Sequence, residues 1–254
     1  MIFSKVAVPK EHGSWGFVLE PLILSLIVAF TLDGLFLALA TFFMFLSNQP
    51  LKVLTTKSAP KKLKPTAKIV LFFYLLITVI LLIFLFFKIK FYLLLPFYSA
   101  ILLLLIYKIA EFSQLSRKLY VELLPIFSMT LIATTIVMID SVFSFDPIIF
   151  GLLLLSRSVP TVLYINAKVK WIKGMKFSTL PTHLLNGGFL IFIVYAVFNN
   201  LLPMLSILGM IILTARSIIG FSKFNFTKTV KQIGVVEFIY GGFFVVINGI
   251  AFLA

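Results

Sequence analysis

The sequence predicts an all-α protein that crosses a membrane many times. Apolar residues make up 61% of the 254 residues and charged residues only 12%, and the mean hydropathy is +1.17. Soluble domains lie far from these values. The apolar stretches are expected to be helices, because lipid cannot hydrogen-bond a free backbone and the alternating pattern of a membrane barrel is absent.

Nine stretches reach or approach the roughly 20 residues that span a hydrocarbon core. We place them near residues 13–31, 34–51, 67–87, 91–109, 119–139, 146–167, 178–197, 200–219 and 234–253. They account for most of the chain, so residues 1–254 are predicted to form a single transmembrane domain.

Basic residues lie between these stretches mostly on one side. A Lys-rich segment follows the second predicted helix, and further Lys or Arg residues follow the fourth, sixth and eighth. The opposite side holds only Lys88 and Lys90. Since an excess of Lys and Arg marks the cytoplasmic face, the N-terminus is predicted to be cytoplasmic and Ala254 to lie outside.

The formal net charge of +14 is therefore mostly a topology signal. Lys runs beside membrane helices contact anionic headgroups more often than nucleic acid. Membrane lipids are therefore the expected partners, and nucleic acid is not expected to bind. The chain has no cysteine, and its two histidines, His12 and His183, do not form a ligand-spaced pair. No metal site is predicted, and the sequence identifies neither a cofactor nor an oligomeric state.

Two charged residues lie deep within apolar stretches. Glu20 is inside the first stretch and Arg157 is midway through the sixth. A charge at that depth is costly and usually faces a bundle interior, where it meets a partner, a substrate or an ion. The two residues lie at similar depths, so they can pair. The plainer alternative is a buried ion pair that only fixes helix packing.

Helical spacing indicates which polar groups can act together, because residues three, four and seven apart share a face. It places Arg157, Thr161, Tyr164 and Lys168 on one stripe of the sixth predicted helix. Polar residues of several helices converge on the cytoplasmic half, which predicts a shared cavity there. The candidate binding residues are Glu20, Asn48, Lys52, Arg157, Tyr164, Lys168, His183, Asn186, Arg216 and Glu237.

Two proline-containing segments form a candidate internal repeat. They are Leu46-Ser47-Asn48-Gln49-Pro50 and Leu155-Ser156-Arg157-Ser158-Val159-Pro160. The segments lie four helices apart, and each precedes a basic loop. A true repeat would imply two related halves whose corresponding helices face one cavity.

Two motifs resemble the YwiC-like integral membrane proteins. They are Pro9-Lys10-Glu11-His12-Gly13-Ser14-Trp15, followed by Leu19-Glu20-Pro21, and Ser156-Arg157-Ser158-Val159-Pro160-Thr161-Val162-Leu163-Tyr164. The resemblance spans the whole chain. It implies an integral protein of the bacterial cytoplasmic membrane, and it implies no established activity.

The chain is more distantly similar to the UbiA-type intramembrane prenyltransferases in its nine helices, cytoplasmic N-terminus and polar helix ends. This likeness implies a UbiA-like bundle with a cytoplasmic-side cavity. The superfamily holds magnesium on Asp-rich motifs, whereas this chain has Asn48 and Lys52 at the first position and Asn166, Lys168 and Lys170 at the second. Metal-dependent prenyl transfer is therefore not expected, and the cations would bind an anion directly.

The leading hypothesis is binding of an anionic isoprenoid or lipid in a cation-lined cavity, with transfer or modification of that molecule left open. Arg157 and Arg216 would clamp the anion, and Glu11 or His12 would be the catalytic base of any reaction. One alternative is a transporter for a small anion, with Glu20 and Arg157 as coupling groups. The other is a structural or assembly subunit.

Overall fold

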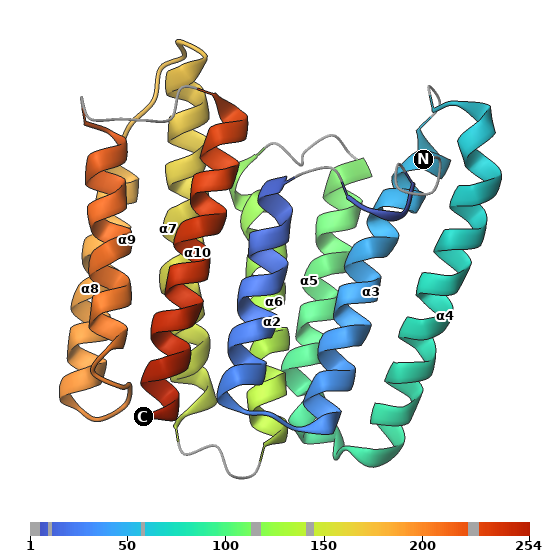
Figure 1. Cartoon of the computed structure of the whole chain (residues 1–254), viewed down its shortest axis with the longest axis horizontal. Helices are drawn as coiled ribbons and strands as arrows, with labels where there is room; N and C mark the ends of the chain where they lie inside the picture. The colour runs from blue at the N-terminus through green and yellow to red at the C-terminus, as the bar shows by residue number, and fades with distance from the viewer. Residues whose placement is uncertain (1–5, 10–11, 57–58, 113–117, 141–144, 223–228) are drawn as a thin grey trace.

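The computed structural model of the chain is a bundle of antiparallel helices (Figure 1). It describes residues 6–9, 12–56, 59–112, 118–140, 145–222 and 229–254. The helices are α2 (His12–Val28), α3 (Leu32–Thr55), α4 (Lys64–Lys88), α5 (Leu95–Phe112), α6 (Leu119–Ile139), α7 (Pro147–Ile172), α8 (Leu180–Phe198), α9 (Ser206–Gly220) and α10 (Val230–Leu253). Short 3-10 turns, Lys61–Leu63 and Phe91–Leu94, lead into α4 and α5. No β-strand occurs in the described residues, so the all-α prediction is confirmed.

Seven of the described helices, α3 to α8 and α10, are long and apolar enough to cross a membrane. The apolar segments of α2 and α9 are shorter, Ser14–Val28 and Ser206–Gly220. The prediction of an integral membrane protein is thereby supported, and seven of its nine expected crossings have the required length. Crossing by α2 and α9 stays a prediction.

Successive helices run in opposite directions (Figure 1). The last turns of α3, α5, α7 and α9 and the first turns of α4, α6, α8 and α10 lie at one end of the bundle, which we call the Lys-rich end. Its described basic residues include Lys52, Lys61, Lys62, Lys64, Lys108, Lys170, Lys173 and Lys231. The C-terminus lies at the other end. Which end faces the cytoplasm stays a prediction.

Local sequence explains where several helices begin. The side chain of Thr31 accepts a hydrogen bond from the backbone N–H of Gly34 at 2.9 Å, at the start of α3. Asp146 accepts one from the N–H of Ile148 at 2.7 Å, at the start of α7. These side chains satisfy backbone donors that have no partner within the helix.

Two helices are followed by a residue in the left-handed backbone conformation. Asn200, with φ of 57°, follows α8, and the N–H of Leu201 donates back to the carbonyl of Ala196 at 2.8 Å. Gly174, with φ of 66°, follows α7 in the same way. Such motifs satisfy the last carbonyls of a helix. Because of the turn at Asn200, α9 begins at Ser206 rather than near residue 200 as predicted.

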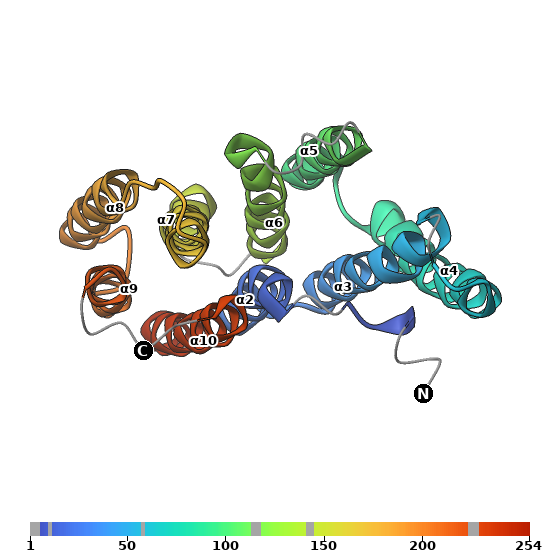
Figure 2. The same cartoon turned by 90° about the horizontal axis from the view of Figure 1, so that it is seen from above.

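The helices form two groups of four around α2 (Figure 2). In one group α3 packs against α4 and α6, and α5 packs against α6; in the other α7 packs against α8, α9 and α10. Helix α2 packs against α6 and α10, the last helix of each group. The two proline-containing motifs lie on α3 and α7, the first helix of each group, and an internal repeat stays a prediction.

Helix α2 also joins two apolar cores. Its residue Leu24 packs in a cluster with Phe150 of α7 and Phe244 of α10, whereas Val18 packs in a second cluster with Leu37 of α3. The fold thus holds α2 between the two groups, with one face against both cores (Figure 2). Glu20, which lies between these two core residues of α2, is carried inward with them.

Candidate functional site

Four helices bring two acidic and two basic side chains together inside the bundle. Glu20 comes from α2, Arg157 from α7, Arg216 from α9 and Glu237 from α10. We call these four residues the ion cluster. Their side chains are between 2% and 12% exposed. Charged groups are seldom buried this far unless they are paired.

Arg157 is the centre of the ion cluster. Its Nε lies 3.2 Å from Oε2 of Glu20, and its Nη2 donates to Oε1 of Glu20 at 3.3 Å. Nη2 also donates to the backbone carbonyl of Glu237 at 3.0 Å, and Nη1 lies 3.6 Å from Oε2 of Glu237. Arg157 therefore links α2, α7 and α10. The matched depth of Glu20 and Arg157 in the sequence does correspond to an ion pair.

Arg216 approaches the carboxylate of Glu237 from another side. Its Nη1 donates to Oε2 of Glu237 and, at 3.2 Å, to Oγ1 of Thr161. The Nη1 of Arg157 donates to the same hydroxyl oxygen. Oxygens of Thr161 and Glu237 thus lie between two guanidinium groups. This is how two arginines hold a carboxylate or a phosphate.

Two glycines make room for Glu20. Its Oε1 lies 2.8 Å from the place that a Cβ would take at Gly16, one turn earlier on α2. The same carboxylate would overlap a Cβ at Gly241 of α10. Small residues let membrane helices approach closely, and here they let a charged side chain fit between α2 and α10.

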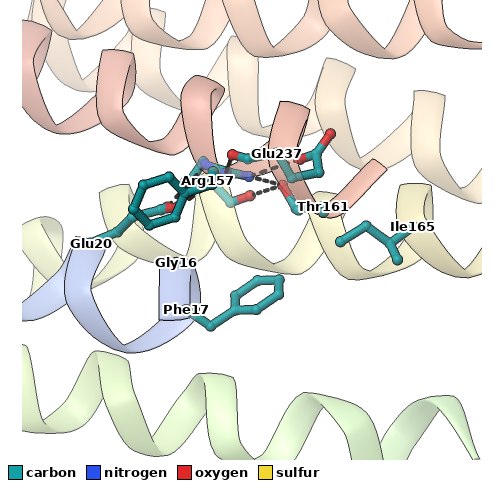
Figure 3. Close-up of a pocket in the computed structure, with 9 residues that line it drawn as sticks. Gly16, Phe17, Glu20, Arg157, Thr161, Ile165 and Glu237 are labelled. Atoms are coloured by element: carbon teal, nitrogen blue, oxygen red, sulfur yellow. Dashed lines mark hydrogen bonds and ion pairs between the residues drawn. The ribbon is translucent and has the colours of Figure 1, made fainter. Parts of the chain in front are cut away.

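A pocket lies beside the ion cluster between α2, α7 and α10 (Figure 3). Its volume is about 20 Å³, enough for one water molecule. Glu20, Arg157 and Glu237 supply its polar wall, and Phe17 and Ile165 line it nearer to the Lys-rich end. A larger cytoplasmic-side cavity, as the UbiA likeness implies, stays a prediction.

The rest of the α7 stripe faces α9. The ring of Tyr164 lies 4.8 Å from Cζ of Arg216. Lys168 is fully buried, and its Nζ donates to the carbonyl of Gly220 at the end of α9. That Nζ also lies 4.4 Å from the centre of the Trp171 ring. A cation is stabilised at the C-terminal carbonyls of a helix, so Lys168 stabilises the end of α9.

Helix α8 adds one predicted residue to this network. Nδ2 of Asn186 donates to Oγ of Ser217 at 3.0 Å, and Nη2 of Arg216 donates to the same oxygen at 3.4 Å. Asn186 is therefore connected to the ion cluster through one hydroxyl. His183 instead packs edge-on against Phe221, with ring centres 5.7 Å apart.

Two predicted residues lie in the other group of helices. Asn48 is exposed on α3, and its Nδ2 donates to the carbonyl of Phe45 at 3.2 Å. Lys52 is exposed one turn later. Since α3 packs against α2, α4 and α6, the structure keeps both residues apart from α9 and α10 (Figure 2).

The two candidate catalytic residues lie in the N-terminal motif. Glu11 is outside the described residues, and so is the side chain of His12. Their roles stay predictions. Within the described segments of the chain, no three His, Cys, Asp or Glu residues gather as a metal site would require. The carboxylate and guanidinium groups of the ion cluster can form ion pairs and exchange protons.

Sequence reasoning left out three residues that contact the predicted ones. Thr161, which bridges the two arginines, is on the predicted α7 stripe but not among the candidate ligands. Trp171 lies three residues after Lys168, and that spacing is a usable signal. Phe221 packs against Tyr164 with ring centres 5.0 Å apart, and no feature of the sequence points to it.

Comparison with known protein families matches the chain to the family described as YwiC-like protein, over residues 8–137. No curated protein and no solved structure matches the chain. The matched region contains the N-terminal motif and Glu20, whereas the motif around Arg157 lies beyond it. Because the match covers more than half of the 254 residues, the chain is a member of the YwiC-like protein family.

Proposed function

We propose that this YwiC-like membrane protein binds the anionic head group of an isoprenoid or lipid at Arg157. The phosphate or carboxylate of that molecule would take the place of the Glu20 carboxylate. The position of Glu20 is the observation that carries the proposal. Its side chain is 12% exposed, more than any other member of the ion cluster, and it lines the pocket.

The two carboxylates of the ion cluster are held differently. Glu20 contacts the guanidinium of Arg157, at 3.2 and 3.3 Å. Glu237 contacts both Arg157 and Arg216. Displacing Glu20 therefore removes a carboxylate partner from one arginine, whereas displacing Glu237 would remove one from two. An incoming anion that binds Arg157 in bidentate fashion would make two charge-assisted hydrogen bonds in place of the contacts that Glu20 loses.

The apolar portion of the ligand would lie between α2 and α10. Phe17 and Phe238 line the pocket beside the ion cluster, and Phe238 is 47% exposed on the outside of α10. The pocket wall is thus continuous with a surface that faces lipid. A site with a guanidinium on one side and aromatic rings leading to lipid favours an amphiphile.

Native mass spectrometry of the protein in a neutral detergent would test this proposal, with dihexanoyl phosphatidylglycerol as the anionic probe. We expect the wild type to retain the lipid and Arg157→Gln to lose it. Glu20→Gln should retain it at least as well, because the competing carboxylate is gone. Lys88→Gln is the matched control, since it removes a cation paired with Asp33 at the opposite end. Equal binding by wild type and Arg157→Gln would overturn the proposal.

A structural role is a second candidate, favoured by the charge balance of the ion cluster and the small volume of its pocket. Buried ion pairs can fix helix packing without binding any ligand. This role predicts that no phosphatidylglycerol is retained. It also predicts that deleting the protein destabilises a partner complex and leaves lipid pools unchanged.

Transport of a small anion is a third candidate, favoured by buried polar groups beyond the ion cluster. Ser206 of α9 and Asn248 of α10 are fully buried, and Oγ of the first and Oδ1 of the second have no hydrogen-bond partner among the described residues. Such atoms commonly bind water, which would extend a polar path toward the other end. Flux of phosphate or small carboxylates into proteoliposomes would support transport.

A further inference from the structure

We infer that anion binding at Arg157 is coupled to the uptake of one proton by Glu20. The inference rests on the proposed function and adds a coupled ion to it. The observations behind it are the charge balance of the ion cluster, the different partners of its two carboxylates, and the pocket beside Glu20.

The charges of the ion cluster cancel one another. Two guanidinium groups face two carboxylates. A singly charged head group on Arg157 would add one negative charge and would leave Glu20 without its guanidinium partner. A carboxylate isolated in a low-dielectric interior becomes neutral by binding a proton rather than staying charged.

Glu20 is the carboxylate that accepts the proton. Glu237 keeps its hydrogen bond from Arg216 when Arg157 is occupied by the ligand. Glu20 has no second guanidinium contact of that kind among the described residues, and Gly16 and Gly241 adjoin it instead. The uncharged acid can then give up its place on Arg157 to the ligand without leaving an unpaired charge in the interior.

The pocket is where water would bring that proton to Glu20. It has room for about one water molecule beside Glu20, and Phe17 and Ile165 line it nearer to the Lys-rich end. One O–H bond forms on the Glu20 carboxylate, and one proton leaves the surrounding water and buffer. No other covalent bond is made or broken.

The charged groups around Glu20 come from the helices around α2. Glu20 faces Arg157 from α7 and Glu237 from α10, with Arg216 of α9 farther away. Helices α3 and α6 also pack against α2, and their charged residues lie in first or last turns, at Asp33, Lys52 and Glu122. The state of Glu20 therefore depends chiefly on whether Arg157 is free to pair with it.

Titration calorimetry with dihexanoyl phosphatidylglycerol would test the coupling, because this lipid carries one charge that does not titrate near neutral pH. The binding heat would be measured at one pH in several buffers of different ionisation enthalpy. Its dependence on that enthalpy gives the number of protons taken up. We expect about one proton per bound lipid for the wild type and close to none for Glu20→Gln, which should still bind.

Glu111→Gln is the matched control, since Glu111 is an exposed carboxylate paired with Lys108. It should bind lipid and take up protons as the wild type does. Binding without proton uptake by the wild type would overturn the coupling and leave the proposed function intact. Failure of the wild type to bind would overturn both. Because the decisive measurement is on the wild type, the result stands even where a variant does not fold.

Discussion

Gly241 of α10 lies directly against the carboxylate of Glu20 of α2. The contact shows that the interface of α2 and α10 is shaped around a charged side chain rather than around apolar packing alone. The absence of a side chain at residue 241 lets the carboxylate reach Arg157, 3.2 Å away. A glycine thus leaves the space that the carboxylate of this ion pair occupies.

Gly241→Ala should therefore destabilise the protein. The added methyl group would overlap the Glu20 carboxylate, and overpacking of a filled site costs about 1 to 3 kcal/mol. Thermal unfolding in detergent should show a lower midpoint. Gly242→Ala is the control, because no side chain of another helix lies within 4 Å of a Cβ there and alanine favours a helix. Equal midpoints for the two variants would show that Glu20 moves aside freely.

Hydropathy alone places the helices well, since the hydrocarbon core demands a long apolar run for each crossing. It does not show where α9 begins or α7 ends, because Asn200 and Gly174 act through single backbone dihedral angles. Gly174 does predict a helix end from the sequence, because glycine readily adopts the left-handed backbone conformation that follows many helices. The late start of α9 at Ser206 follows from the turn at Asn200.

The sequence shows which charged residues lie at a common depth in the membrane, but it does not show which of them form ion pairs. Glu20 and Arg157 are matched because each is conspicuous in an apolar stretch. The ion pair of Arg216 and Glu237 joins α9 to α10. It forms only where the rotation of each helix about its own axis turns these two side chains toward each other. A helix in lipid can be apolar on every face, so the sequence carries little information about that rotation. Asn48 and Lys52 are predicted from their place in the UbiA likeness, and they lie in the other helix group.

Glu237→Gln should destabilise the protein more than Glu20→Gln. Glu237 contacts both arginines, whereas Glu20 pairs with Arg157. Breaking a buried pair leaves an uncompensated charge and costs about 3 to 5 kcal/mol. Unfolding in detergent would give the order of the two variants, with exposed Glu111→Gln as the control. A larger loss for Glu20→Gln would mean that Arg157, not Glu237, holds the cluster together.

Lys168→Met should change the fluorescence of Trp171 and loosen the end of α9. The ammonium group lies 4.4 Å from the centre of that ring and donates to Gly220. The emission would be measured in a Trp15→Phe background, because the chain has two tryptophans. The free energy of unfolding should fall by about 1.5 to 3 kcal/mol, the range for a hydrogen bond made by a charged group. Lys173→Met, at an exposed position, should alter neither quantity.

Cysteine labelling should place the Lys-rich end in the cytoplasm. The chain has no cysteine, so Lys62→Cys and Lys90→Cys each create a single reactive site, and both positions are exposed at opposite ends of the bundle. In intact cells a membrane-impermeant maleimide should label the position 90 variant, and the position 62 variant should react only after permeabilisation. The physical reason is the excess of Lys at one end, since such loops are retained on the cytoplasmic side. The reverse pattern would mean that the pocket beside Glu20 draws its anion and its proton from outside the cell.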